Sequence, residues 1–228
     1  MQASSLRLEY CSAKAARYAV RRWHYSKRLP IGPLVKVGVW EGGAFIGVVL
    51  FGRGACAALG NPYGLHKTEV CELVRIALRQ HSAPVSRIVR IALALLRKQC
   101  PGIQLVVSFA DPFHGHVGGI YQAGNWIYTG MSASIFEYWH AGRWKHSREA
   151  SGGAFGGKRQ ISRAQFAKLQ RRKRTGKHRY LMGLDVKTRA MIEALKQPYP
   201  KRQPIEGACY PAGIGGADPT LALQGIHE

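Results

Sequence analysis

The chain has 228 residues, of which 46% are hydrophobic and 20% are charged, a balance that suits one α/β domain with a single core and excludes a disordered or fibrous chain. Its 34 Lys and Arg outnumber 12 Asp and Glu. The net charge of +22 indicates a polyanionic partner, nucleic acid above all, rather than solubility alone. Five cysteines without a C-x-x-C pair argue against a disulfide framework and a structural zinc site. Because no apolar run approaches the roughly 18 residues of a membrane span, we expect a cytoplasmic protein with no membrane contact.

The N-terminal part predicts one helix among three strands. A strand is expected at 6–10, and Ser12 then caps a helix whose apolar residues recur at helical spacing. Strands at 34–40 and 44–51 flank Glu41-Gly42-Gly43, which is typical of a hairpin turn. The stretch 52–67, rich in Gly, Ala, Asn and Pro, predicts a loop.

Residues 69–109 predict a strand, a helix and a second, parallel strand. Strict alternation in 69–78 places Arg75 on the same face as Cys71, Leu73 and Ala77. The helix is expected to follow an N-cap at Ser82, and the apolar run 103–109 predicts a strand buried on both faces. Because ligands of open α/β sheets bind beyond the carboxyl ends of parallel strands, a site is expected at those two strand ends.

The C-terminal part predicts shorter elements. A short helix is expected at 114–123, and strands at 126–129, 134–140 and near 180–184. We expect one α/β domain over 1–185 that includes a basic segment at 158–179. A helix and a partly disordered tail should follow over 186–228.

The segment 158–179 holds ten Lys and Arg, one His and no acidic residue. Such a segment can neutralise phosphates whatever the base sequence, unless it is only a solvated helix face or a disordered tail. The DNA contacts predicted here are Arg171, Arg172, Lys173, Arg174, Lys177 and Arg179. The run 143–148 interleaves an aromatic residue with cations, which is a weaker indication of base stacking.

Four further features either take part in binding or chemistry, or serve only the structure. Arg75, on an expected central strand, either pairs with a core carboxylate or faces a ligand. Asp111, at the end of a buried strand, is either catalytic or a turn residue. His24-Tyr25 joins a proton shuttle to a phenol unless it only shapes a loop. His114 and His116 have the spacing of metal ligands but lack a third one.

Taken together, several short blocks resemble the Mom family of bacteriophage DNA-modification proteins, in order over roughly residues 6–185. The blocks are His24-Tyr25-Ser26, Glu72-Leu73-Val74-Arg75, Ala110-Asp111-Pro112, Gly115-His116-Val117-Gly118, the run Ile-Tyr-Gln-Ala-Gly-Asn-Trp-Ile-Tyr-Thr-Gly at 120–130, and Lys177-His178-Arg179-Tyr180. The part from Tyr121 to Gly130 is the most specific.

This resemblance implies a GNAT acetyltransferase-like fold, with a mixed sheet splayed around an acyl-donor cleft, flanking helices and a basic C-terminal extension. It implies that a carbamoylmethyl (glycinamide-like) group is added to N6 of adenine in phage DNA, which protects that DNA from restriction in the host cytoplasm. The family's functional residues fall on His24, Tyr25, Arg75, Asp111 and Tyr121. Double-stranded DNA is the implied partner, and a homodimer is one further expectation.

The resemblance also implies acetyl-CoA or another acyl donor, and iron, for which His24 and Asp111 would form a hard-ligand pair. GNAT enzymes cradle the pyrophosphate of coenzyme A on a Gly-rich turn, but the corresponding turn here has no glycine. Arg79, Gln80 and Ser82 would have to bind that phosphate instead. Two other functions stay open: an acyltransferase acting on structured RNA, and a non-catalytic nucleic-acid-binding protein on the same scaffold.

Overall fold

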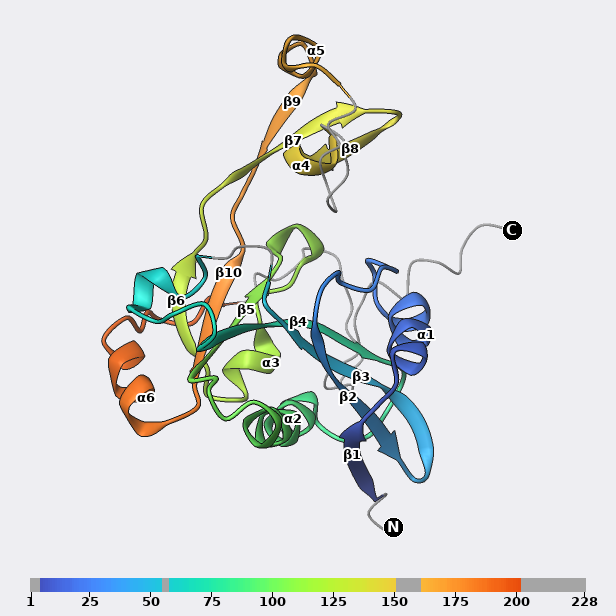
Figure 1. The fold of residues 1–228 in the computed structure, drawn as a ribbon, viewed down its shortest axis with the longest axis vertical. Helices are drawn as coiled ribbons and strands as arrows, with labels where there is room; N and C mark the ends of the chain where they lie inside the picture. Colours follow the sequence, from blue (N-terminus) through green and yellow to red (C-terminus); the bar gives the residue numbers. More distant parts are fainter. Residues whose placement is uncertain (1–4, 55–57, 151–160, 202–228) are drawn as a thin grey trace.

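The computed structural model describes residues 5–54, 58–150 and 161–201, which form a large sheet with helices on both faces and a smaller sheet that projects from it (Figure 1). The tail predicted to be partly disordered lies outside these residues from 202 onward. None of the helices in the described part is long and apolar enough to cross a membrane.

The large sheet has seven strands in the order β1-β2-β3-β4-β5-β10-β6. Its strands are β1 (Leu6–Tyr10), β2 (Leu34–Glu41), β3 (Ala44–Gly52), β4 (Val70–Leu78), β5 (Leu105–Ala110), β6 (Ile127–Met131) and β10 (His178–Gly183). Only the β4–β5 pair is parallel, and the other neighbours run antiparallel. The predicted mixed α/β sheet is therefore confirmed, with β10, which begins at the end of the basic segment, inserted between β5 and β6.

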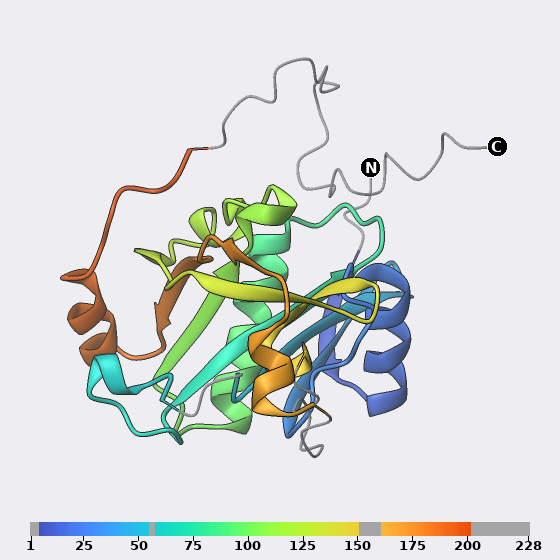
Figure 2. The same ribbon diagram turned by 90° about the horizontal axis from the view of Figure 1, so that it is seen from above.

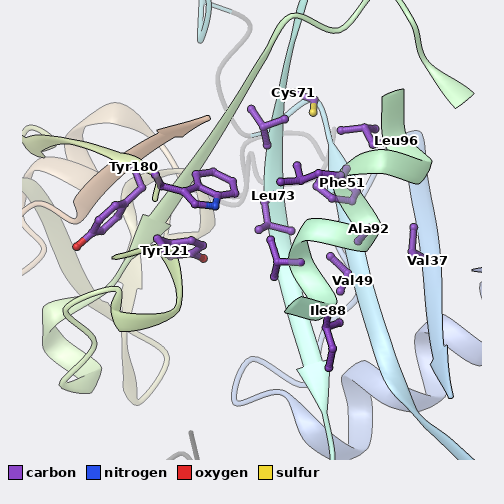
Figure 3. Close-up of a cluster of buried hydrophobic side chains, with 14 of the residues drawn as sticks. Val37, Val49, Phe51, Cys71, Leu73, Ile88, Ala92, Leu96, Tyr121 and Tyr180 are labelled. Carbon is purple, nitrogen blue, oxygen red and sulfur yellow. The ribbon is translucent and has the colours of Figure 1, made fainter. Parts of the chain in front are cut away.

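Helices cover both faces of this sheet. They are α1 (Ala13–Trp23), α2 (Val85–Gln99), α3 (Gly119–Gln122) and α6 (Val186–Glu193), with single 3-10 turns η1 (Asn61–Tyr63) and η2 (Pro112–His114). Because successive strand residues point to opposite faces, Val49 and Phe51 of β3 pack with α2, whereas Val48 and Leu50 pack with α1. Figure 3 shows the α2 side of the core, with Tyr121 and Tyr180 at its other end.

The predicted start of α2 is wrong by a few residues. The N-cap of this helix is Pro84, whose side chain has no group that could form a capping hydrogen bond, and Ser82 lies two residues before it. The Ser82 hydroxyl instead hydrogen-bonds to Glu41. By contrast, Ser12 caps α1 as predicted, since its side chain accepts a hydrogen bond from the Ala15 N–H.

The predicted alternation along β4 is also wrong, because the pairing register of β3 with β4 shifts between Leu50 and Phe51. The shift marks a β-bulge, which turns the following side chains to the other face. Leu73 therefore packs with α2, whereas Ala77 packs with α1. Arg75 pairs with Leu50, whose side chain lies on the α1 face, so it does not share a face with Leu73.

The small sheet is built from β7 (Ile135–His140), β8 (Arg143–His146) and β9 (Arg171–Arg174), in the order β8-β7-β9. Together with α4 (Ser147–Ala150) and α5 (Arg163–Ala167) it forms an extension that we call the arm. The arm stands above the large sheet in Figure 1 and lies over that sheet when seen from above in Figure 2. The chain enters the arm from β6 and returns through β10.

Residues 186–201 pack on the large sheet as well. Ile192 of α6 is fully buried against a cluster that includes Leu181 of β10. Beyond the helix, the Gln197 N–H donates to the Tyr128 carbonyl, and the Tyr199 hydroxyl donates to the Trp126 carbonyl. The boundary expected at residue 185 thus falls inside a unit whose packing continues to about residue 200.

Candidate functional site

The candidate site lies where β4 and β5 separate. These parallel strands pair only from Val70 with Leu105 to Glu72 with Val107, although both continue further. Beyond that point the Leu73 carbonyl has no strand partner on β5 and is reached instead by the Ser108 hydroxyl, 3.0 Å away. The sheet therefore opens at the carboxyl ends of two parallel strands, where ligands of α/β folds bind.

An aromatic cluster formed by Tyr25 and three histidines lies at this edge. The ring centroid of Tyr25 is 4.3 Å from that of His24, 4.6 Å from that of His114 and 6.4 Å from that of His116. His24 and Tyr25 follow α1, whereas the other two histidines flank the turn after β5. The structure thus brings together two motifs that the sequence left separate. Tyr25 remains 47% exposed, so its ring is available to a planar ligand.

The hydrogen bonding of His24 and the electrostatic surroundings of His114 determine which ring nitrogens of this cluster can accept a proton. The Ser26 N–H donates to His24 Nδ1 over 3.1 Å, which leaves Nε2 to carry the proton of the neutral ring. Burial lowers the pKa of His114, Asp111 opposes that effect, and Arg174, His116 and Lys177 add to it. His114 is therefore unprotonated at neutral pH and able to accept a proton.

Tyr121 is buried where the strands part. Its hydroxyl lies 2.7 Å from the Ser108 hydroxyl, which also contacts the Leu73 carbonyl. A serine has one proton and a carbonyl can only accept, so Tyr121 donates to Ser108 whenever Ser108 donates to Leu73. Burial raises the pKa of Tyr121 to about 12, with smaller contributions from nearby Glu72 and Tyr25. Tyr121 therefore stays protonated and serves as a fixed hydrogen-bonding group.

Glu72 and Ser108 belong to this site although sequence reasoning did not single them out. Glu72 is the last β4 residue paired with β5, and its charge is near enough to raise the pKa of Tyr121. Gly54 lies against the Glu72 carboxylate and has a φ of 73°, a backbone conformation that favours glycine. Glu72 was quoted only as part of a family-like block, and Arg75 alone was given a role, because a charge among apolar residues of a strand is conspicuous.

Arg75 has unused hydrogen-bonding capacity. Its Nη1 donates to the adjacent Val74 carbonyl over 2.6 Å, while its Nε is buried and has no hydrogen-bond partner among the described residues. None of the salt bridges in the described part of the chain includes Arg75. Of the two predicted roles, pairing with a core carboxylate thus finds no support among these residues. A buried donor without a partner is costly unless a ligand satisfies it.

Asp111 is engaged by the arm and the strand that leaves it. Its Oδ2 lies 2.9 Å from Arg174 Nη2 and 3.4 Å from Lys177 Nζ, and its Oδ1 accepts from the Phe113 N–H. Burial alone would raise the pKa of Asp111, but Lys177, Arg174 and this N–H outweigh it and lower the pKa. The carboxylate is ionised and holds the turn after β5, and it does not pair with Arg75.

The predicted iron ligands do not fit a metal centre in this geometry. Both oxygens of Asp111 already accept hydrogen bonds or ion pairs, and His24 uses Nδ1 to accept from Ser26. Within 5–54, 58–150 and 161–201, no group of three or more His, Cys, Asp or Glu is arranged to hold a metal ion. The donor set at His24 and Asp111 is therefore not one that iron would need.

The turn predicted to bind the donor's phosphate is already occupied by a side chain. Glu41 at the end of β2 accepts hydrogen bonds from the backbone N–H groups of Ser82 and Ala83, at 2.9 and 2.8 Å. Arg79 and Gln80 of the same turn are exposed. With no glycine and its amides already bonded, this turn does not fit the pyrophosphate of coenzyme A.

The predicted DNA contacts on β9 alternate between two faces of the arm. Arg172 and Arg174 face β7, where each forms an ion pair with the buried Glu137, at 2.8 and 2.7 Å. Their guanidinium groups also lie over the ring of Phe113, at 5.7 and 4.1 Å from its centroid. This inner face of the arm, formed by Glu137, Arg172 and Arg174 with Trp144, is thus turned toward the loop after β5.

The opposite, outer face of the arm is formed by Phe136, Tyr138, Lys145, Arg171 and Lys173. Cross-strand pairing sets Phe136 beside Lys173, and Tyr138 beside Arg171 and Lys145. Arg171 and Lys173 are exposed and form no ion pair within the described part of the chain. Phe136 is 41% exposed, and the Arg171 guanidinium lies 5.1 Å from its ring centroid.

The last two predicted DNA contacts lie at the base of the arm. Lys177 is bound to Asp111 and its side chain is 42% exposed. Arg179 is on β10, where its Nε donates to the Thr129 hydroxyl over 2.9 Å. Arg171, Lys173 and Arg179 have no carboxylate partner among the described residues, and of these three Arg171 and Lys173 are exposed.

A shallow groove of about 600 Å³ lies elsewhere, between the end of α2 and α6. Its lining includes Arg97, Gly183 and Glu193. Gly183 pairs with Leu105 at the start of β5, so this groove is at the opposite end of the strand from Asp111. It contains none of the residues predicted to act on a ligand.

Comparison with known proteins supports the resemblance seen in the sequence. The chain is 29% identical over 203 residues to the methylcarbamoylase mom of Escherichia phage Mu, a match that covers 86% of this chain and 84% of that relative. Among solved structures, it is similar to an N-acyl amino acid synthase from uncultured soil microbes, with a TM-score of 0.45 and 11% identity over 82% of this chain and 94% of the other. A model of the Mom protein family matches residues 5–201. The chain belongs to the Mom protein family.

Proposed function

We propose that this protein transfers a carbamoylmethyl group to N6 of adenine in double-stranded DNA. The methylcarbamoylase name of its phage Mu relative supports the group that is transferred. The observation that carries the proposal is the aromatic cluster at the open end of β4 and β5. There the exposed ring of Tyr25 meets three histidines, close to the buried hydroxyl of Tyr121.

Adenine N6 is a weak nucleophile because its lone pair is delocalised into the ring, so the base must be held out of the helix and its N6 proton removed. In our proposal the exposed part of the Tyr25 side chain contacts the flipped base. The unprotonated His114, 4.6 Å from that ring, accepts the proton. The new N6–carbon bond forms as the donor's bond to the carbamoylmethyl carbon breaks, and the leaving group departs with that electron pair.

Arg75 provides a hydrogen-bond donor for the carbonyl oxygen of the transferred group in this proposal, and the Tyr121 hydroxyl holds Ser108 in place through their hydrogen bond. The buried Nε of Arg75 has no partner among the described residues. Tyr121 stays protonated because burial raises its pKa to about 12. Preorganised donors of this kind stabilise developing charge without the cost of reorienting solvent.

DNA would be bound by the outer face of the arm. Lys145, Arg171 and Lys173 supply positive charge for phosphates, and Phe136 supplies an exposed ring between them. Phe113 and Asp111 tie the inner face to the turn that carries His114. The arm that would carry the phosphates is therefore fixed to the part of the chain that holds the proposed base-binding cluster.

The test is mass spectrometry of nucleosides from plasmid DNA after expression of the protein in a bacterial host. We expect deoxyadenosine that carries a carbamoylmethyl group in place of one N6 hydrogen, and DNA that resists restriction enzymes whose sites contain adenine. Tyr25→Ala should abolish the product, whereas Tyr18→Ala, which alters a tyrosine of similar exposure on α1, should not.

Two results would contradict the proposal. Unmodified plasmid adenine together with modified tRNA would favour an acyltransferase that acts on structured RNA. Tight DNA binding by folded protein without any modified nucleoside would favour a non-catalytic binding protein.

A further inference from the structure

The carboxylate of Glu41 closes the turn between β4 and α2. Its Oε1 accepts from the Ser82 hydroxyl and from the Ala83 N–H, both at 2.8 Å, and its Oε2 accepts from the Ser82 N–H at 2.9 Å. Three donors of one turn thus converge on a single anionic side chain from a strand that lies 41 residues earlier. The arrangement is that of an anion-binding turn with its anion supplied by the protein.

The backbone holds Glu41 in this position. It is the last residue of β2, paired with Leu6 on one side and with Ala44 on the other. The next residue, Gly42, donates its N–H to the Ser5 carbonyl and has a φ of 57°, which favours glycine. Because two strands and a tight turn fix the backbone, the Cα of Glu41 is held where its carboxylate can reach the turn.

The electrostatics favour a permanent negative charge here. Burial alone would raise the pKa of Glu41, but the hydrogen bonds from Ser82 and Ala83 outweigh it, and a nearby His81 acts in the same direction, so the pKa is lowered. A phosphate brought to the same amides would meet an ionised carboxylate at close range. Like charges so close together repel one another, and one of them has to leave.

The rest of the turn has few groups that could bind a phosphate. No glycine occurs between Arg79 and Pro84, and the N-cap Pro84 has no N–H to donate. The exposed side chain of Arg79 is left as a cation, but a single exposed cation on a chain with net charge +22 is not selective for any anion.

We propose that Glu41 substitutes for a bound phosphate, and that the group donor of this protein binds without delivering a pyrophosphate to the turn between β4 and α2. The donor implied by the family resemblance, acetyl-CoA, would have to carry its nucleotide elsewhere or be replaced by a donor that lacks one. The inference concerns the donor alone and does not depend on which base is modified.

The test compares coenzyme A binding to the wild-type protein, Glu41→Ala and Glu9→Ala by calorimetry and by backbone amide NMR. Glu9→Ala is the matched control, because Glu9 on the edge strand β1 is ion-paired, within the part of the chain that the structure describes, only to the exposed Arg7, and its loss changes the net charge equally. In wild type, coenzyme A should leave the Ser82 and Ala83 amide signals unshifted. In Glu41→Ala these signals should shift, and affinity should exceed that of Glu9→Ala by roughly fivefold to thirtyfold.

Glu41→Gln guards against misfolding, because glutamine retains an acceptor for the turn without its charge. It should melt close to the wild-type temperature and bind coenzyme A more tightly than Glu9→Gln. The proposal is overturned if coenzyme A shifts the Ser82 and Ala83 amides of the wild-type protein. It is equally overturned if a folded Glu41 variant binds coenzyme A no more tightly than its Glu9 counterpart.

Discussion

Asp111 and Arg174 form the ion pair that fastens the arm to the large sheet, with 2.9 Å between Oδ2 and Nη2. Asp111 directly follows β5, whereas Arg174 ends β9 and also reaches Glu137 of β7 at 2.7 Å. The side chain of Asp111 is 8% exposed and that of Arg174 is 17% exposed, so water screens the pair only weakly. The same carboxylate that begins the turn with His114 therefore also orients the arm.

Breaking this pair should destabilise the protein more than it affects any single chemical step. We expect Asp111→Ala to lower the free energy of unfolding by about 3 kcal/mol, because Arg174 is left with one of its two carboxylate partners. A double-mutant cycle with Arg174→Ala, measured by denaturant unfolding, should give a coupling of about 1–3 kcal/mol. Additive single effects would mean that the two residues act separately.

Stability should fall in acid because of the same carboxylates. Arg174 helps hold the pKa of both Asp111 and Glu137 below their ordinary values of 3.8 and 4.5, against the raising effect of burial. A lowered carboxylate pKa contributes stability that is fully present above the ordinary value and is lost as the pH falls through the folded-state value. Thermal melts between pH 6 and pH 3 should decline less steeply for Asp111→Asn than for wild type. Equal slopes would contradict this assignment.

Arg75 should matter for activity and little for folding. Because it lacks an ion pair among the described residues, Arg75→Lys should leave the melting temperature nearly unchanged while modification of DNA falls at least about tenfold. Lysine keeps the charge but loses the planar donor Nε. Arg90→Lys, an exposed change on α2, serves as the control in the nucleoside assay. Full activity of Arg75→Lys would exclude the proposed contact.

The effect of the Tyr121 hydroxyl on activity should be separable from the effect of the Tyr121 ring on stability. Tyr121→Phe keeps the ring contacts with Trp126 and Tyr180, so the expected loss of stability is about 1 kcal/mol, whereas activity should largely disappear. Tyr128→Phe is a matched control, since that buried hydroxyl bonds only to His178 Nδ1 in the described structure. It should lose similar stability and keep its activity; the reverse pattern would make the role of Tyr121 structural.

DNA affinity should depend on alternate residues of β9. Substituting Arg171 and Lys173 with glutamine should weaken binding to all sequences alike and reduce the slope of log affinity against log salt by about 2. The same change at Arg172 and Arg174 should mainly lower the melting temperature, because these residues are paired with Glu137. A larger slope change from the second pair would place DNA on the inner face instead.

The sequence by itself determined the features that depend on near neighbours along the chain. Helical spacing and the Ser12 cap predicted α1, and an apolar run between turns predicted β5, because a helix or strand buries its face at a fixed period. Residue chemistry singled out His24 and Tyr25, and the family resemblance added Tyr121; the structure does bring these three to one edge of the sheet.

The tertiary structure decided which distant groups meet. A bulge opposite Phe51 places Arg75 on the α1 face. Strict alternation does not predict this, because the single extra residue of a bulge produces no periodic pattern in the sequence. Asp111 found its partner in Arg174, and Ser82 found Glu41, at separations of 63 and 41 residues. Such contacts depend on how strands and loops close in space, and a chain with 34 basic residues offers each carboxylate many equivalent partners.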